Sequence, residues 1–307
     1  MAKFQIFTDS CSDLSTEDRQ LYGVEYVRMN IVVDGKELPA DLDWVAYKPE
    51  EFYGWLAEGR HVKTTQVPLT EFIDRFTPFL EKGIDILYIA CSSALSGSIN
   101  IFELAKQELL EKFPDRKIIG VDSLDGALTE GMCVIMAALK QKEGASIDEV
   151  AEYTLSVRNN FIQLATVETL SYLKAAGRIK ASKAIMGNLF HKKPIFISDA
   201  HGNNYTLGTV TGTKNADNEL VKGLKERLLK DKCNIVYIGQ GMAQERAEKM
   251  KTRLLEEIKD IEVRIRWIGP IVGTTCGPGV FSVFGFGKEV TVFDGDGKAP
   301  GLDYSKL

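Results

Sequence analysis

Residues 84–90 read IDILYIA, and this apolar, largely β-branched run constrains the fold more than any other feature of the sequence. Such a run is typical of a strand that is buried on both faces of a parallel sheet. Shorter strand patterns occur at residues 3–7 and 117–121. Amphipathic or apolar patterns predict helices between and after these strands, at residues 70–81, 99–113 and 129–142. Strands that alternate with helices imply right-handed crossovers, and therefore a three-layer α/β/α domain with a mainly parallel sheet.

The pattern changes after Ser146. We predict helices at residues 146–159, 215–229 and 244–259, and strands at residues 161–167, 194–198, 234–239, 263–268 and 289–293. A turn is expected at residues 201–204. The change of pattern places a domain boundary near residues 158–166. We therefore expect an N-terminal domain over residues 1–160 and a C-terminal α/β domain over residues 161–307.

Composition excludes several classes of protein. The 307 residues carry 38 Lys and Arg against 43 Asp and Glu, a net charge of −5, and 44% of them are hydrophobic. A protein that binds nucleic acid through bulk charge needs a basic face, so that class does not fit. No stretch approaches the roughly 18 consecutive apolar residues of a membrane span, and the N-terminus lacks a signal-peptide core. We expect a soluble, cytoplasmic protein.

Motifs for independent catalysis are absent from the sequence. It contains no GxSxG, no GxxxxGK[ST] and no HExxH, and Gly285-Phe286-Gly287 lacks the third glycine of a dinucleotide fingerprint. The five cysteines are widely spaced and form no CxxC pair, which makes a disulfide framework and a structural zinc site unexpected. From these absences we expect no catalytic residues and no metal.

Small hydroxyl and glycine residues instead gather where strands end. The clusters are Thr8-Asp9-Ser10, Thr64-Thr65-Gln66, residues 91–98 (CSSALSGS) and Asp122-Ser123. Carboxyl ends of parallel strands form the ligand crevice of α/β sheets, and hydroxyls there suit an anionic oxygen ligand. Each residue taken singly is also an ordinary turn or helix-capping residue. Several such clusters at comparable positions favour a binding site.

Taken in order, these clusters resemble the motifs of the DegV family of bacterial fatty-acid-binding proteins. The resemblance continues in the second half of the chain and extends over nearly its whole length. The matching segments there are residues 170–179 (LSYLKAAGRI), 193–195 (KPI) and 269–279 (GPIVGTTCGPG). Each motif is weak alone, whereas seven in the right order are a specific signal.

The resemblance implies a two-domain, DegV-like α/β protein, with a three-layer N-terminal domain and a two-layer C-terminal domain, that buries one long-chain fatty acid in an apolar tunnel. It also implies a partner, a separate fatty acid kinase that phosphorylates the presented carboxylate with ATP. The chain itself is then a carrier without a cofactor, and its ligand is the fatty acid.

The same resemblance assigns residues to roles. The carboxylate would be held by Thr64, Thr65, Ser96, Gly97 and Thr275, and Arg178 would face the kinase or its nucleotide. Seven further residues either line the tunnel or belong to the ordinary hydrophobic core: Phe281, Phe284, Met132, Ile185, Met186, Leu189 and Phe190. Two departures matter. Thr275 stands where many members have a histidine, and Ala176 replaces the first glycine of the pair before Arg178.

Two alternatives remain open at this point. One is a sensor or regulator whose lipid-loaded form binds another protein without a kinase. The other is an enzyme that uses Ser96 or Asp9 in acyl or phosphoryl chemistry; the absent histidine partner and nucleotide loop weigh against it.

Overall fold

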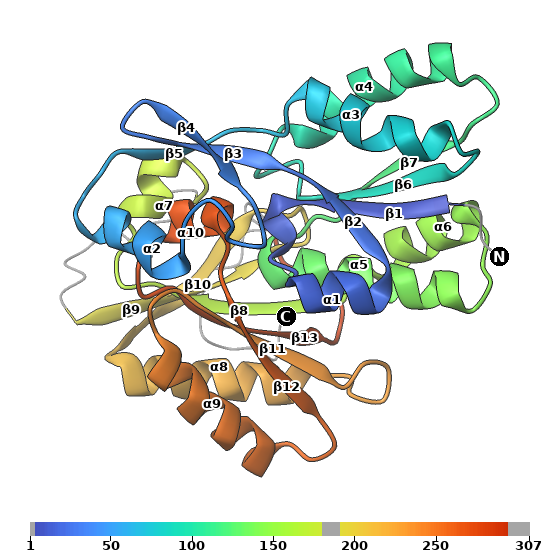
Figure 1. Cartoon of the computed structure of the whole chain (residues 1–307). Coiled ribbons are helices and arrows are strands. Elements are labelled where there is room, and N and C mark those ends of the chain that lie inside the picture. Colours follow the sequence, from blue (N-terminus) through green and yellow to red (C-terminus); the bar gives the residue numbers. More distant parts are fainter. Residues whose placement is uncertain (1–3, 180–190, 294–307) are drawn as a thin grey trace. The chain divides into compact units, whose positions relative to one another are not determined.

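A computed structural model describes residues 4–179 and 191–293 of the chain. The chain divides into two compact units. The first comprises Met1–Ala46, His61–Arg158 and Gly269–Ile271. The second comprises Tyr47–Arg60, Asn159–Ile268 and Val272–Leu307. Figure 1 shows the helices and strands of both units.

The first unit is built on a four-stranded parallel sheet with the strand order β2-β1-β6-β7. Its strands are β1 (Phe4–Asp9), β2 (Val24–Val27), β6 (Asp85–Ala90) and β7 (Ile118–Asp122). Strand β6 pairs with β1 on one side and β7 on the other, and Ile86 to Ala90 are all buried. The predicted parallel sheet around residues 84–90 is therefore confirmed.

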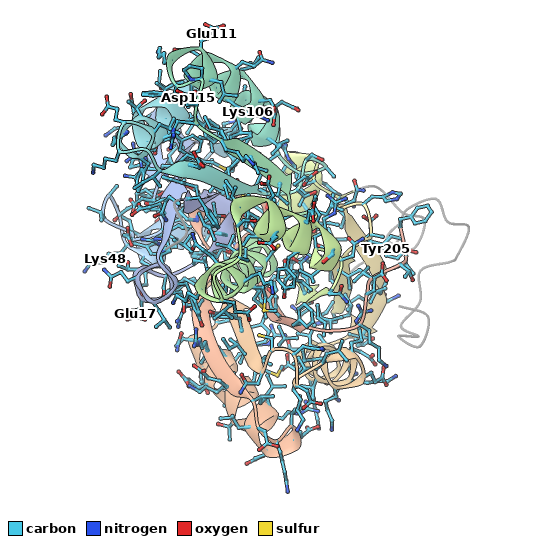
Figure 2. All side chains as sticks on the ribbon, turned by 90° about the vertical axis from the view of Figure 1, so that its right-hand side faces the viewer. Glu17, Lys48, Lys106, Glu111, Asp115 and Tyr205 are labelled. Atoms are coloured by element: carbon cyan, nitrogen blue, oxygen red, sulfur yellow. The ribbon has the colours of Figure 1, made fainter. Side chains whose placement is uncertain are left out.

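Helices cover both faces of this sheet, which confirms the predicted three layers (Figure 1). One face carries α3 (Leu69–Leu80) and α4 (Ser98–Lys112). The other carries α1 (Thr16–Tyr22), α5 (Ala127–Lys142) and α6 (Ile147–Val157). In α3 the apolar positions Phe72, Phe76 and Leu80 recur every four residues and are all buried. Most outward-facing positions of α4 are polar, as Lys106 and Glu111 illustrate (Figure 2), although Leu104 is also exposed.

A second, antiparallel sheet of the first unit was not predicted. It has the order β4-β3-β5 and consists of β3 (Met29–Val33), β4 (Lys36–Ala40) and β5 (Val62–Thr64). Asp34 and Gly35 form the turn between β3 and β4 with positive φ angles of 49° and 85°, as a tight hairpin requires. A short 3-10 helix, η1 (Ser10–Ser12), follows β1.

The second unit contains a six-stranded mixed sheet with the order β10-β9-β8-β13-β11-β12. Its strands are β8 (Phe161–Thr166), β9 (Lys192–Ser198), β10 (Asn204–Thr211), β11 (Ile235–Gln240), β12 (Glu262–Trp267) and β13 (Phe281–Phe286). Helices α8 (Thr213–Arg227) and α9 (Gln244–Glu257) pack on one face. This sheet-and-helix arrangement confirms the predicted two-layer α/β domain. The remaining helices are α2 (Pro49–Ala57), α7 (Ser171–Ala176) and α10 (Pro270–Cys276).

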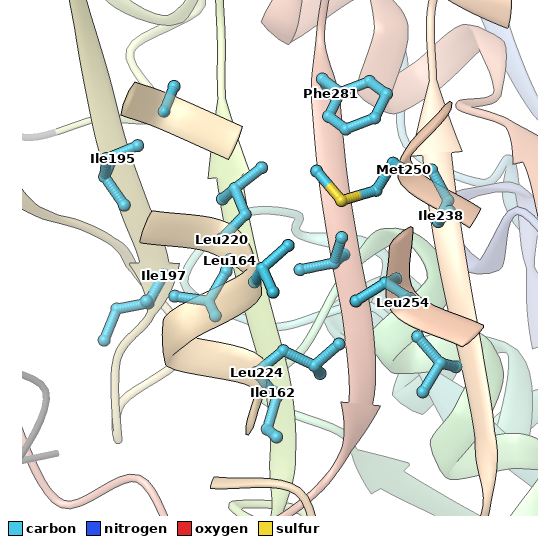
Figure 3. Close-up of a cluster of buried hydrophobic side chains, with 14 of the residues drawn as sticks. Ile162, Leu164, Ile195, Ile197, Leu220, Leu224, Ile238, Met250, Leu254 and Phe281 are labelled. Carbon is cyan, nitrogen blue, oxygen red and sulfur yellow. The ribbon is translucent and has the colours of Figure 1, made fainter. Parts of the chain in front are cut away.

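The layer between this sheet and its two helices is a continuous hydrophobic core. Side chains from alternate positions of the strands, such as Ile162, Leu164 and Ile238, meet Leu220 and Leu254 of the helices (Figure 3). Because strand side chains alternate between the two faces of a sheet, the intervening residues point to the opposite face.

One predicted strand is wrong. Residues 289–293 form no strand, and β13 lies at Phe281–Phe286 instead. The alternating residues Val290 and Val292 are buried against the core, which explains the strand-like pattern. Their main chain makes only isolated bonds, from Val290 N to Asn159 O (2.8 Å) and from Ala200 N to Val292 O (2.8 Å). Burial of alternate side chains therefore occurs here without a ladder of paired strands.

Candidate functional site

The hydroxyl-rich segment after β6 turns into the N-terminus of α4. Gly97 is the residue before the first helical turn, and Ser96 and Gly97 are half-buried. Ser96 Oγ lies 3.0 Å from Ser98 Oγ and accepts a hydrogen bond from Ser98 N over 3.3 Å. The first amides of a helix lack intrahelical partners and carry the positive end of the helix dipole. This end of α4 therefore favours an anionic oxygen.

The second hydroxyl segment follows β5. Thr64 and Thr65 are half-buried, and the Thr65 hydroxyl is fixed against β3. It accepts a hydrogen bond from Asn30 N (3.1 Å), and its own proton is donated to Gln66 O (2.9 Å) or to Asn30 O (3.2 Å). The small antiparallel sheet thus positions this segment, because β3 pairs with β5 up to Thr64.

The structure brings these two segments together within the first unit. Val67 N donates a hydrogen bond to Ser98 Oγ over 3.1 Å. Gln66 also packs against Gly97, where an added Cβ would lie 2.2 Å from Gln66 Nε2. We call Thr64, Thr65, Ser96 and Ser98 the α4 hydroxyl cluster. Ser98 and Gln66 were not predicted as site residues; their positions within the two quoted motifs were the only signal in the sequence.

The first predicted cluster is internal. Asp9 is fully buried and accepts hydrogen bonds from Cys11 N (2.9 Å), Cys91 N (3.1 Å) and Tyr88 Oη (2.7 Å). Burial raises the pKa of Asp9, and the hydrogen bonds from these donors lower it in part. Ser10 Oγ accepts a bond from Met29 N over 2.9 Å. These contacts tie the ends of neighbouring strands together, so this cluster has a structural role.

Two further acids are buried near Asp9. Thr8 Oγ1 donates to Glu130 Oε1 over 2.7 Å, and Gly269 N donates to Asp13 Oδ1 over 2.9 Å. Burial raises the pKa of both Glu130 and Asp13 well above the ordinary range, and the charge of Asp9 adds to the effect. Burial therefore disfavours the charged form of both carboxyl groups in the absence of a nearby cation.

The fourth predicted cluster braces the turn after β6. Ser123 Oγ donates to Ala90 O over 2.7 Å, and Asp122 Oδ1 accepts from Ser93 N over 3.1 Å. Both bonds hold residues that precede the α4 hydroxyl cluster. Asp122 and Ser123 therefore support the cluster and do not extend it.

Thr275 lies in α10, and its hydroxyl is engaged within that helix. Its Oγ1 donates to Val272 O over 2.8 Å. Thr275 is half-buried. Since its proton is committed to a carbonyl, this hydroxyl is left with acceptor capacity.

Arg178 is exposed at the end of α7. Gly177 ends the helix in the left-handed conformation, with φ 68°, and Arg178 N bonds Leu173 O over 3.1 Å. Arg178 O accepts a hydrogen bond from Asn204 Nδ2 over 2.8 Å. The main chain of Arg178 is thus fixed while its side chain is presented on the surface.

The predicted tunnel residues fall in different environments. Phe281 is in the core layer between the sheet and α8 and α9, with the Arg246 guanidinium 4.0 Å from its ring centre (Figure 3). Phe284 is three positions further along β13 and so points to the opposite face, where it packs close to Gly239. Met132 is buried in α5. Ile185, Met186, Leu189 and Phe190 lie outside the described residues.

Among the described residues no helix is both long and apolar enough to cross a lipid bilayer. The two described units define an α/β protein with a parallel sheet in one unit and a mixed sheet in the other, and known proteins share this architecture. Residues 3–288 match the family model described as "Uncharacterised protein, DegV family". The chain belongs to the DegV family.

Relatives and solved structures agree with this assignment. The DegV domain-containing protein CPE0026 of Clostridium perfringens is 33% identical over 301 residues, which cover 98% of this chain and 100% of the relative. A fatty-acid-binding DegV family protein from Thermus thermophilus superimposes with a TM-score of 0.81 at 26% identity, over 93% of this chain and 100% of that one. A stearic-acid-binding protein from Eubacterium ventriosum shares the fold, with a TM-score of 0.81, 24% identity, and coverage of 92% and 97%.

Proposed function

We propose that this protein binds a long-chain fatty acid, with the carboxylate held by Thr64, Thr65, Ser96 and the main chain at Gly97. The observation that carries the proposal is the hydrogen bond between Val67 N and Ser98 Oγ. It brings two hydroxyl segments to one helix N-terminus. Support also comes from the DegV family protein of Thermus thermophilus and the structurally similar protein of Eubacterium ventriosum, both of which are described as binding fatty acid.

Hydroxyls suit this role because of the energetics of a buried carboxylate. An unpaired buried charge costs several kcal/mol, whereas each hydrogen bond to a charged group contributes about 1.5–3 kcal/mol. Two or three donors at the positive end of α4 therefore offset the desolvation of one carboxylate without a formal ion pair. No cofactor is needed, since the fatty acid is the ligand.

Most of the affinity would come from the acyl tail. Each buried methylene contributes about 0.8 kcal/mol, so a long apolar tunnel binds a long chain strongly. Phe284 is our candidate for contact with the tail because it points away from the helix-covered core layer. Phe281 belongs to that core layer and is a weaker candidate.

The carboxylate assignment is tested with the double variant Ser96→Ala, Thr65→Ala and the control Ser93→Ala. Ser93 is exposed in the same turn. We expect the double variant to lose roughly 100-fold in fatty acid affinity, the equivalent of about 3 kcal/mol for two hydrogen bonds to a charged group. The control should bind like the parent protein. Unchanged affinity in a folded double variant would refute the assignment.

We further propose that the bound carboxylate is presented to a separate fatty acid kinase, and that this chain is the non-catalytic binding subunit. Arg178 supports the idea: its main chain is fixed at the end of α7 and its side chain is exposed, as contact with a partner or with nucleotide phosphates requires.

Arg178→Ala tests this second step. The variant should bind fatty acid normally and yield at least tenfold less acyl phosphate when a fatty acid kinase and ATP are added. Arg178→Lys should recover part of the rate, since it keeps the charge but loses the bidentate geometry. Full-rate formation of acyl phosphate with Arg178→Ala would remove Arg178 from the mechanism. Absence of acyl phosphate when such a kinase and ATP are added to the fatty-acid-loaded parent protein would favour a sensor.

A further inference from the structure

Three side chains of the first unit that could bind a metal ion, and that the fatty acid proposal does not use, meet in its interior. They are Cys11 in η1, Cys91 directly after β6, and Glu130 in α5. One ligand atom from each, the two Sγ atoms and a carboxylate oxygen, lie within 4.8 Å of one another, and all three residues are buried. We call these three residues the Cys–Cys–Glu cluster.

Its dimensions fit a tetrahedral metal ion. Zinc lies about 2.3 Å from thiolate sulfur, so two sulfur ligands of one tetrahedral ion are roughly 3.8 Å apart. Spacings up to 4.8 Å therefore need only small side-chain shifts to close around an ion. A fourth soft atom is at hand, because Met29 Sδ lies 3.8 Å from Cys11 Sγ.

One oxygen of the cluster lacks a partner. Glu130 Oε1 accepts the hydrogen bond from Thr8, but Oε2 is buried and has no hydrogen-bond partner among the described residues. A buried polar atom left unsatisfied costs about 1–3 kcal/mol. A cation bound to Oε2 would remove that cost.

Asp9 holds the two cysteines in place. Its Oδ1 accepts from Cys11 N and its Oδ2 from Cys91 N, so one carboxylate fixes the main chain of both sulfur ligands. Such groups behind the ligands orient them and raise metal affinity. Tyr88 Oη bonds the same carboxylate over 2.7 Å and completes the support.

We propose that Cys11, Cys91 and Glu130 bind a thiophilic divalent cation, for which Zn²⁺ fits best. Thiolates disfavour Mg²⁺ and Ca²⁺, which prefer oxygen ligands, and the carboxylate favours Zn²⁺ over Cu⁺. The ion would join the end of β1, the turn after β6 and α5. The turn after β6 leads directly to Ser96, so the ion would stiffen the support of the α4 hydroxyl cluster.

Cobalt binding to the full-length protein tests the site. The reduced protein is stripped with a chelator and titrated with Co²⁺, whose thiolate charge-transfer band reports sulfur ligands, and then with Zn²⁺ in competition. We expect one equivalent to bind with this band, Zn²⁺ to displace Co²⁺, and the thermal midpoint to rise. Absence of the band, or binding of neither ion at micromolar concentration, would overturn the proposal.

Variants assign the ligands. Cys11→Ser and Cys91→Ser should each bind Co²⁺ at least tenfold more weakly and with about half of the band intensity, because one thiolate is lost. Glu130→Gln, which keeps an acceptor for Thr8, should keep the band intensity with at least tenfold lower affinity. Cys233→Ser, in the second unit, is the control and should match the parent protein. A band of parent intensity and affinity in folded Cys11→Ser and Cys91→Ser would refute the site.

Zinc-edge X-ray absorption of the loaded parent protein covers the case in which variants fail to fold. Two sulfur ligands and at least one oxygen ligand are expected, and a shell without sulfur contradicts the proposal. The competing possibility is a disulfide between Cys11 and Cys91. Its formation with peroxide, in a protein whose reduced form binds no Zn²⁺, would favour a redox pair and exclude the metal site.

Discussion

The main-chain amide of Val67 donates a hydrogen bond to the Oγ of Ser98 over 3.1 Å, although the two residues are 31 positions apart. Both groups are buried. This bond joins the segment after β5 to the first turn of α4. It therefore fixes the spacing between the threonines of one motif and Ser96 of the other, on which the proposed carboxylate site depends.

Replacing Ser98 by alanine should weaken both the fold and the binding of fatty acid. The change leaves the buried Val67 amide without its acceptor, which costs about 1–3 kcal/mol of unfolding free energy. We expect a loss in that range by urea denaturation, and a fall of about tenfold in fatty acid affinity because the Thr65 segment is released. Ser93→Ala is the control. Parent-like affinity in Ser98→Ala would show that the bond does not position the site.

Gly97→Ala separates binding from stability. The added methyl group would meet the side-chain end of Gln66, which is exposed and free to shift, so unfolding free energy should change by less than about 0.5 kcal/mol. The methyl group also occupies the space beside the α4 N-terminus, and we expect fatty acid affinity to fall about tenfold.

Gly54→Ala in α2 is the matched control for that substitution, since nothing lies within 4 Å of its added Cβ among the described residues. It should leave binding unchanged and stabilise the helix by up to about 1 kcal/mol. If Gly97→Ala binds fatty acid like the parent protein, Gly97 is not part of the site.

Asp43 should make the stability of the first unit depend on pH. Burial works to raise the pKa of Asp43, but hydrogen bonds from Thr16 and Arg19 and the Arg19 charge outweigh it and lower that pKa. Arg19 Nη2 lies 2.6 Å from Asp43 Oδ1. A lowered folded-state pKa stabilises the fold above the unfolded value of about 3.9, and this contribution is lost as the pH falls through the folded value.

Asp43→Asn should therefore cost about 1 kcal/mol of unfolding free energy at pH 7. The difference in unfolding free energy between the variant and the parent protein should disappear as the pH falls below about 3.9. Urea denaturation at several pH values measures this difference. Asp115→Asn, in the exposed turn after α4 (Figure 2), should change stability by less than about 0.5 kcal/mol. A difference in unfolding free energy that grows at acid pH would contradict the lowered pKa of Asp43 in the folded protein.

Substitutions of two phenylalanines of β13 test which of them contacts the acyl tail and which belongs only to the hydrophobic core. Phe281→Leu and Phe284→Leu each remove buried volume and should cost roughly 1–3 kcal/mol. Only Phe284→Leu should also shift the preferred acyl chain length, since Phe281 belongs to the core with α8 and α9. Affinities for a series of saturated fatty acids measure the preference. A shift in Phe281→Leu alone would reverse the two roles.

Patterns along the sequence predicted three of the four parallel strands, β1, β6 and β7, and missed the short β2. The signal was clearest for β6, because all but the first of its side chains are apolar or aromatic and are buried. The antiparallel sheet β4-β3-β5 was missed for the opposite reason. Its strands are short, and exposed residues such as Lys36 and Glu37 interrupt any clear alternation. The strand predicted at residues 289–293 was wrong because the buried Val290 and Val292 alternate with other residues as they would in a strand, although this segment pairs with no strand among the described residues.

The site was predicted as separate motifs, and only the fold shows which motifs meet. Residues 64–66 and 96–98 adjoin because β5 is held by β3 and α4 follows β6. In the sequence, Thr8-Asp9-Ser10 resembles the other hydroxyl-rich clusters. In the structure its side chains make hydrogen bonds to groups inside the first unit. Cys11 and Cys91 are 80 positions apart, so no motif in the sequence predicts that they lie close together.

Native mass spectrometry of the purified, full-length protein is the most decisive experiment on fatty acid binding. We expect one long-chain fatty acid bound per chain, either co-purified or taken up on incubation with stearic acid, and much weaker uptake by the Ser96→Ala, Thr65→Ala variant. A folded parent protein that keeps its unliganded mass after incubation with stearic acid and with an unsaturated fatty acid of the same length would contradict this expectation.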